Sequence, residues 1–225
     1  MKELKLKEIE IAMQNNAWHF GNEVLYKMCR ENFEHKNNQH ILAKVLFIGR
    51  IYAAAIERRK TKSNDINDNF YIDTVAPTFQ NSDIDKYLNK LKNIQSLESK
   101  NLELVLETHY YLTKVIHKIT DQNKRSLVSK YLHFHLPELF FIYDTRAVEA
   151  LRNYKTKVPA TLKYLTELEN IDIEYAKFFC KCYELKKEIQ QNFNITFSNR
   201  HLDNLLIENA NFKNSEKRKI ILTSH

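Results

Sequence analysis

Apolar residues recur along most of the chain at steps of three and four positions, the spacing that places side chains on one face of an α-helix. Such a helix needs one buried face, so polar residues fill its other positions. We therefore predict an all-α protein. The second predicted helix contains Trp18 and has Phe20, Val24, Leu25 and Met28 on its inner face. The predicted helices cover residues 4–13, 17–32, 40–60, 83–94, 99–119, 126–136, 145–152, 161–169, 172–191 and 200–209.

A polar stretch over residues 61–80 interrupts the helical pattern. It is rich in Asn and Asp and contains Pro77, which is typical of a loop. A loop of this length is uncommon inside a compact domain, so we expect it to separate two lobes or to face a substrate. We expect one domain over residues 1–225, with a cleft between a lobe of residues 1–97 plus 160–225 and a lobe of residues 98–159.

Residues 126–147 join a helix, an apolar elbow and one carboxylate at the start of the next helix. The helical spacing runs to Leu136, where Pro137 disfavours further helix. A short apolar run follows, and Asp144 then stands directly before the next helix, which begins at Thr145. Asp is among the preferred N-cap residues, and the same geometry can also direct a carboxylate into a cleft. The local pattern is compatible with both roles.

The chain contains only 2 glycines and 3 prolines in 225 residues. So few glycines leave little scope for turns with positive φ, which argues against an all-β or a doubly wound α/β fold. The sequence also lacks the glycine-rich phosphate-binding motifs of dinucleotide-binding and P-loop proteins. We accordingly expect no cofactor.

The net charge of +7 permits an anionic partner such as nucleic acid. No apolar run is long enough to span a membrane, and residues 1–10 lack the apolar core of a signal peptide. The 3 cysteines show no disulfide-framework spacing, which fits a reducing compartment. We expect a cytoplasmic protein without a membrane partner and predict no particular oligomeric state.

Two pairs of candidate metal ligands occur on predicted helices: His133 with His135, and Cys180 with Cys182. The members of each pair are two positions apart, so their side chains point to different helix faces. They cannot share a metal as histidines four residues apart do. We interpret both pairs as packed side chains and expect no metal site.

A basic cluster, Arg58-Arg59-Lys60, ends the helix predicted over residues 40–60. The helix dipole favours cations at a C-terminus, which is one interpretation of the cluster. The other interpretation is a phosphate-contacting surface that includes Arg50, two turns earlier.

The central stretch also resembles a known superfamily. The residues that carry the resemblance are Ser129-Lys130-Tyr131-Leu132, Pro137-Glu138-Leu139-Phe140 and Ile142-Tyr143-Asp144-Thr145-Arg146-Ala147. Through them, residues 119–147 resemble the helix-hairpin-helix DNA glycosylases, most closely a divergent prokaryotic 8-oxoguanine-glycosylase-like branch. Weaker similarities lie at residues 43–58 and 199–203. The resemblance implies a two-lobed fold with a helix-hairpin-helix-like element, here without a glycine in its hairpin.

By that resemblance, Asp144 takes the place of the superfamily's essential aspartate, which stabilises charge on the sugar or activates the nucleophile. Bifunctional members add a lysine that forms a Schiff base with the sugar C1′. In the hairpin of this chain, residues 120–126, Lys124 is the nearest amine, and Lys130, further into the helix, is the second candidate. The implied activity is excision of a flipped, damaged base that resembles 8-oxoguanine from double-stranded DNA.

Further residues are predicted to contact nucleic acid on the same basis. The alternative function is a non-catalytic helical module that binds nucleic acid, or a protein partner in a defence or regulatory system, through the same basic surface. The predicted contacts are Arg50, Arg58, Arg59, Arg125 and Arg146, with Trp18, Phe20 and Tyr143 as stacking residues.

Overall fold

The computed structural model describes residues 2–58 and 69–223 of the chain. Regular structure in these ranges is helical, without a strand, which confirms the all-α prediction. The α-helices are α1 (Leu6–Met13), α2 (His19–Glu31), α3 (Asn38–Ile51), α5 (Ala76–Gln80), α6 (Ile84–Leu91), α7 (Leu102–Thr120), α8 (Arg125–His135), α9 (Thr145–Tyr154), α10 (Ile173–Phe193) and α11 (Asn199–Thr223). Shorter segments are the π-helix η1 (Phe70–Val75) and the 3₁₀-helices η2 (Ser99–Asn101) and η3 (Ala160–Thr166).

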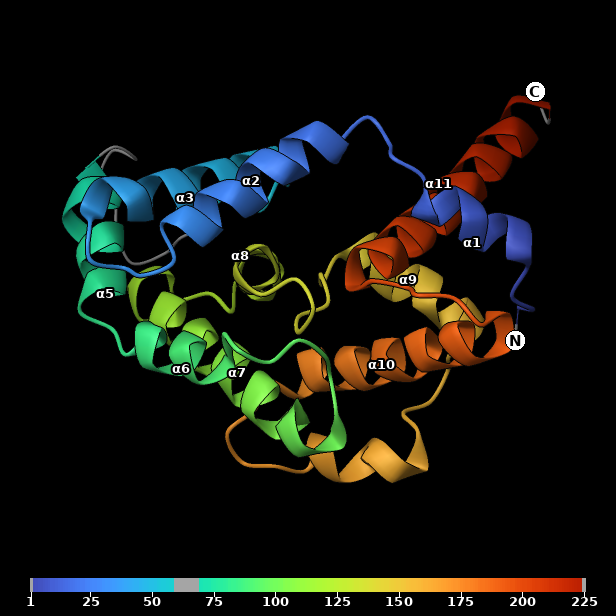
Figure 1. Ribbon diagram of the computed structural model, residues 1–225. Helices are drawn as coiled ribbons and strands as arrows, with labels where there is room; N and C mark the ends of the chain where they lie inside the picture. The colour runs from blue at the N-terminus through green and yellow to red at the C-terminus, as the bar shows by residue number, and fades with distance from the viewer. Residues whose placement is uncertain (1, 59–68, 224–225) are drawn as a thin grey trace.

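Helix α8 lies at the centre of the molecule. Figure 1 shows it end on, between α2 above and α7 and α10 below. Every residue from 127 to 135 is buried, and α8 packs against α2, α3 and α7. A helix buried on all sides is ordinarily apolar, but α8 carries Lys130, His133 and His135 into the interior. These polar side chains need hydrogen-bond partners there.

A short connection joins helices α7 and α8. Residues 121–124 connect them, and Asp121 adopts a left-handed conformation with φ of 58°. The Asp121 N–H donates to the His117 carbonyl at 2.8 Å, and the Gln122 N–H donates to Thr120 Oγ1 at 3.2 Å. Asp is one of the few residues besides glycine that tolerates this conformation, so the connection forms without glycine.

Helix α3 ends in a tight reversal of the chain. Ala53 adopts a left-handed conformation with φ of 51°. The Ala54 N–H donates to the Gly49 carbonyl at 2.7 Å, and the Ala53 N–H donates to the Arg50 carbonyl at 3.3 Å. These two hydrogen bonds form a Schellman C-cap, which satisfies carbonyls at the end of the helix.

The prediction of a helix over residues 40–60 was therefore wrong in its last part. Alanine favours helix by propensity, and the reversal depends on tertiary packing that the local sequence does not show. Because α3 ends at Ile51, Arg58 does not lie in its last turn, and the dipole interpretation of the basic cluster does not apply to it. Arg59 and Lys60 lie outside the described residues.

The prediction of a loop over residues 61–80 was wrong for its second half. Residues 70–80 form η1 and α5, and residues 61–68 lie outside the described residues. Phe70, Val75 and Phe79 are fully buried, so apolar burial outweighs the local Asn and Asp content. Pro77 lies in the first turn of α5, where its missing N–H needs no partner. Similarly, part of the helix predicted over residues 161–169 forms the tighter η3.

Helix α2 buries only part of its predicted inner face. Leu25 and Cys29 point into the core, whereas Trp18, Phe20 and Val24 are 63%, 80% and 50% exposed. Phe20 with Val24 and Leu25 with Cys29 are both four residues apart, so the spacing alone allows either face. The inner positions predicted for Phe20 and Val24 were wrong, and the inner position predicted for Leu25 is confirmed.

One connected hydrophobic core runs through the described chain, from Ile9 of α1 to Ala210 of α11. Cys29, Cys180 and Cys182 lie within it as free thiols. The division into two lobes stays a prediction. Among the described residues, no three His, Cys, Asp or Glu side chains are grouped to hold a metal ion. No helix in the described ranges is long and apolar enough to cross a membrane.

Lys44 of α3 is fully buried beside α8. Its Nζ donates to the Asn32 carbonyl at 2.7 Å and lies 3.2 Å from His135 Nε2. Burial lowers the pKa of Lys44 to about 8. The folded protein therefore holds this proton less tightly than the unfolded chain does.

We expect Lys44 alone to raise the free energy of unfolding by about 1 kcal/mol between pH 8 and pH 9. The unfolded chain, with a lysine pKa of 10.5, keeps its proton in this window while the folded protein releases it. Stability rises wherever the unfolded state binds more protons. Chemical denaturation of the wild type and of Lys44→Met at both pH values measures the difference.

Buried thiols increasingly oppose this trend as the pH rises toward 9, the ordinary pKa of a thiol, so the contribution of Lys44 is measured against the variant. Burial raises the pKa of Cys29 to about 12, so the unfolded chain forms the thiolate first. The Lys44→Met variant retains this thiol and serves as the control. The same pH dependence in both proteins would contradict the role assigned to Lys44.

Candidate functional site

Lys130 lies in the second turn of α8, and its side chain is 3% exposed. Its Nζ donates to Ser126 Oγ at 2.8 Å, one helical turn earlier. The same Nζ lies 3.4 Å from Asp144 Oδ2. An amine from the central helix thus meets the carboxylate that follows the elbow.

Asp144 is the N-cap of α9, which confirms one of its two predicted roles. Its Oδ1 accepts a hydrogen bond from the Arg146 N–H at 3.0 Å, while Oδ2 faces Lys130. Capping and the contact with the buried amine therefore use different oxygens of one carboxylate. Ser129 Oγ holds the preceding elbow because it accepts a hydrogen bond from the Tyr143 N–H at 2.9 Å.

Burial and neighbouring charges shift the pKa of both groups. Burial lowers the pKa of Lys130, although the carboxylates of Asp144 and Asp203 oppose this. Burial acts to raise the pKa of Asp144, but the positive charges of Lys130 and Arg146 outweigh it, and the pKa is lowered overall. Asp144 is thus ionised at neutral pH. The amine beside it loses its proton more readily than a solvated lysine, which favours its nucleophilic form.

Lys130 and Asp144 line a cavity of about 420 Å³, here called the Lys130 cavity. This volume falls in the range of sites that bind small organic groups. Arg146 and Trp18 also line the cavity, and both are more than half exposed. A cation and an aromatic ring therefore stand where the cavity meets solvent.

A second ion pair, Arg200 with Asp203, lines the same cavity. The two residues lie in the first turns of α11, with Arg200 Nη1 at 3.0 Å from Asp203 Oδ2. Arg200 Nε donates to Tyr26 OH at 3.0 Å. The guanidinium lies 5.4 to 5.8 Å from the ring centroids of Tyr26, Tyr52 and Phe134. Aromatic rings and hydrogen bonds therefore hold it in one orientation.

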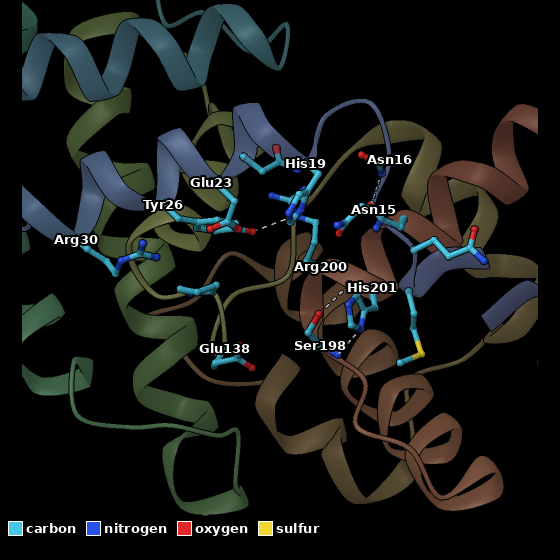
Figure 2. Close-up of a pocket in the computed structure, with 15 residues that line it drawn as sticks. Asn15, Asn16, His19, Glu23, Tyr26, Arg30, Glu138, Ser198, Arg200 and His201 are labelled. Carbon is cyan, nitrogen blue, oxygen red and sulfur yellow. Dashed lines mark hydrogen bonds between the residues drawn. The ribbon is translucent and has the colours of Figure 1, made fainter. Parts of the chain in front are cut away.

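A second cavity, of about 310 Å³, adjoins the first at Arg200 and is here called the Glu23 cavity. Figure 2 shows Glu23 and Arg30 of α2 across this cavity from His201 of α11. Arg200 lines both cavities. Its guanidinium is thus part of the wall between them.

Lys124, the first candidate for a Schiff-base amine, lies away from Asp144. Its Nζ donates to the Arg58 carbonyl oxygen, and Lys124 does not line the Lys130 cavity. Of the two predicted amines, the structure brings Lys130 to the carboxylate.

Some predicted nucleic-acid contacts are engaged in other interactions. Arg50 forms an ion pair with Glu57, and Arg125 Nε lies 2.7 Å from Asp172 Oδ2. The Arg125 guanidinium also lies over the Tyr143 ring, 5.4 Å from its centroid. The other predicted contacts are Arg146 and Trp18 at the Lys130 cavity, Arg58 and Phe20 at exposed positions, and Arg59 outside the described residues.

No family model, curated protein or solved structure matches the chain. The resemblance to the DNA glycosylases therefore stays a prediction, and function must be inferred from the chemistry of the site. That chemistry combines a buried amine of lowered pKa, an ionised carboxylate 3.4 Å away and an adjoining cavity.

Proposed function

We propose that the protein is a DNA N-glycosylase in which Lys130 attacks the sugar of a nucleotide flipped out of duplex DNA. The contact between Lys130 Nζ and Asp144 Oδ2 in the cavity wall carries this proposal. An amine of lowered pKa beside a carboxylate supplies the groups needed for covalent attack on an electrophilic carbon. The net charge of +7 favours association with a polyanion.

In the proposed reaction, the bond between the sugar C1′ and the base nitrogen breaks, and the base leaves with the bonding electron pair. The Asp144 carboxylate stabilises the positive charge that develops on the sugar. The neutral amine of Lys130 forms a bond to C1′ and gives up a proton, which Asp144 accepts. The C1′–O4′ bond then breaks as the nitrogen lone pair forms the C1′=N bond, and the ring oxygen takes the proton held by Asp144. A protonated Schiff base between Lys130 and C1′ remains, and the released base takes its proton from water.

The surroundings of the amine support this substrate class. A base inside a duplex is out of reach, so an enzyme of this kind needs a cavity that receives the flipped nucleotide. The Lys130 cavity has a volume suited to one such group. At its edge, Trp18 offers a stacking face and Arg146 a cation for the backbone.

Base release by the purified wild-type protein tests the proposal. Duplexes that each carry one 8-oxoguanine, uracil, hypoxanthine or alkylated base are incubated with it, and free base is measured by mass spectrometry. The matched control is the double variant Lys130→Gln/Asp144→Asn, purified in parallel, because a contaminating host glycosylase would be present in both preparations. Release by the wild type alone is the expected result.

Release by neither protein would contradict the proposal. DNA affinity measured over a range of salt concentrations then identifies the alternative. Affinity that falls steeply with salt would indicate a non-catalytic nucleic-acid-binding module.

A further inference from the structure

The ion pair of Arg200 and Asp203 leaves one donor and one acceptor without a partner. Arg200 Nη2 and Asp203 Oδ1 are buried atoms that make no hydrogen bond. The other polar atoms are engaged, Arg200 Nε with Tyr26 OH and Arg200 Nη1 with Asp203 Oδ2. Buried charged groups are ordinarily fully hydrogen-bonded, because an unpaired group loses its hydration without compensation. Two such atoms on one pair beside a cavity indicate that a ligand supplies the missing partners.

The pair is also held rigidly in the cavity wall. The rings of Tyr26, Tyr52 and Phe134 surround the guanidinium, and Figure 2 shows Arg200 beside Tyr26. Arg200 and Asp203 both line the cavity that contains Lys130. The other buried side-chain atoms without partners in the described part of the chain lie outside both cavities, on Glu8, His109 and His117.

We propose that Arg200 and Asp203 read the edge of the flipped base, with Nη2 donating to a carbonyl oxygen and Oδ1 accepting from the adjacent ring N–H. This inference rests on the proposed function and names its substrate class. The class comprises bases with a lactam edge, as in uracil, hypoxanthine and guanine, including the 8-oxo form of guanine. Guanidinium groups commonly donate to base carbonyls, and carboxylates accept from base N–H groups.

Bases with an amidine edge, cytosine and adenine, present the reverse pattern. They carry an amino group where uracil and hypoxanthine carry the carbonyl, and a bare ring nitrogen where these carry the N–H. Against Arg200 and Asp203, both hydrogen bonds would become contacts between like partners. A site built to hydrogen-bond its substrate rejects such a mismatch strongly. The pair thereby selects uracil over cytosine and hypoxanthine over adenine.

Binding of free bases tests the pair without any reaction. Trp18 is the sole tryptophan of the chain and lines the Lys130 cavity, so its fluorescence reports occupancy. We expect the wild type to bind uracil and hypoxanthine more tightly than cytosine and adenine, by roughly 10- to 150-fold, the range for one bidentate base contact. Asp203→Asn, which replaces the accepting carboxylate, is expected to remove this preference.

The matched control for that variant is Asp172→Asn. Asp172 is also a buried carboxylate paired with an arginine, Arg125, but it does not line the Lys130 cavity. This variant is expected to keep the preference for lactam bases. If thermal melting shows that Asp203→Asn does not fold, Arg200→Lys replaces it, because lysine keeps the charge and lacks the Nη2 donor.

Borohydride trapping on abasic DNA separates this inference from the proposed function, because an abasic site offers no base to read. Asp203→Asn is expected to remain trappable, with half-maximal trapping at a lower pH because Asp203 also raises the pKa of Lys130. The same variant is expected to release uracil from duplexes roughly 10- to 150-fold more slowly. Equal binding of both classes by the wild type, or an unchanged preference in Asp203→Asn, would overturn the inference. If the wild type binds lactam bases selectively but is never trapped on abasic DNA, base recognition by Arg200 and Asp203 would be supported and the proposed glycosylase activity refuted.

Discussion

Replacing Lys130 with glutamine is expected to abolish covalent trapping of the protein on abasic DNA. Borohydride reduces a Schiff base to a stable amine, so trapping reports the amine that attacks C1′. Lys130 Nζ lies 3.4 Å from Asp144 Oδ2 and lines the cavity, which is the position that the proposed attack requires. The loss should be roughly 100-fold or more, as expected when the attacking group itself is removed. Denaturing gels of borohydride-treated mixtures measure it.

Lys124→Gln is the matched control for this prediction. Lys124 Nζ donates to the Arg58 carbonyl outside the Lys130 cavity, so its replacement should leave trapping nearly unchanged. Thermal melting of both variants separates a chemical effect from unfolding. Trapping that survives in Lys130→Gln and disappears in Lys124→Gln would return the role to Lys124.

The choice between these two lysines shows what the sequence could and could not predict. Position along the chain favours Lys124, because it directly precedes the helix that follows the hairpin. Helix α8, however, is buried on every side, so its residues show no polar face from which the direction of Lys130 could be read. The meeting of Lys130 with Asp144 depends on the elbow between α8 and α9, a tertiary feature.

Asp144, by contrast, was predictable in its local role. An N-cap needs only the residue type and the start of the next helix, both of which are local. Its second role needs Oδ2 to face an amine 14 positions earlier in the chain. The sequence is compatible with that role but does not predict it. Residue spacing across a non-helical elbow does not determine the direction in which the Asp144 side chain points.

For Arg200 and Asp203, the sequence contained a weaker indication of a functional role. Their spacing of three positions places them on one helix face, which predicts an ion pair but not a site. The aromatic rings around Arg200 come from residues of α2, α8 and the end of α3. Contacts between such distant segments have no periodic signature.

Replacing Asp144 with asparagine is expected to slow base release by roughly 10²- to 10⁴-fold, the usual contribution of an acid–base group. Asparagine caps a helix about as well as aspartate, so the hydrogen bond from the Arg146 N–H should remain. The negative charge beside Lys130 is lost, and with it the stabilisation of positive charge on the sugar. Single-turnover rates with protein in excess measure the effect on the chemical step.

Asp144→Ala separates the charge from the cap. Alanine loses both, at a further cost in stability of about 1 kcal/mol. If the carboxylate acts chemically, both variants should be similarly slow, although Asp144→Ala unfolds at lower denaturant concentration. An active Asp144→Asn beside an inactive Asp144→Ala would show that only the cap matters.

The pH dependence of trapping tests whether Asp144 acts through its charge. A purely structural role of Asp144 would leave this pH dependence unchanged when the residue is replaced. The carboxylate raises the pKa of Lys130 against the effect of burial. Removing it in Asp144→Asn lowers the pKa of Lys130 further, because a buried ammonium loses its nearest opposite charge. The neutral amine then forms at lower pH, so the residual trapping of Asp144→Asn should reach half its maximum at a lower pH than in the wild type. A profile that stays in place or moves to higher pH would contradict the pairing of the two groups.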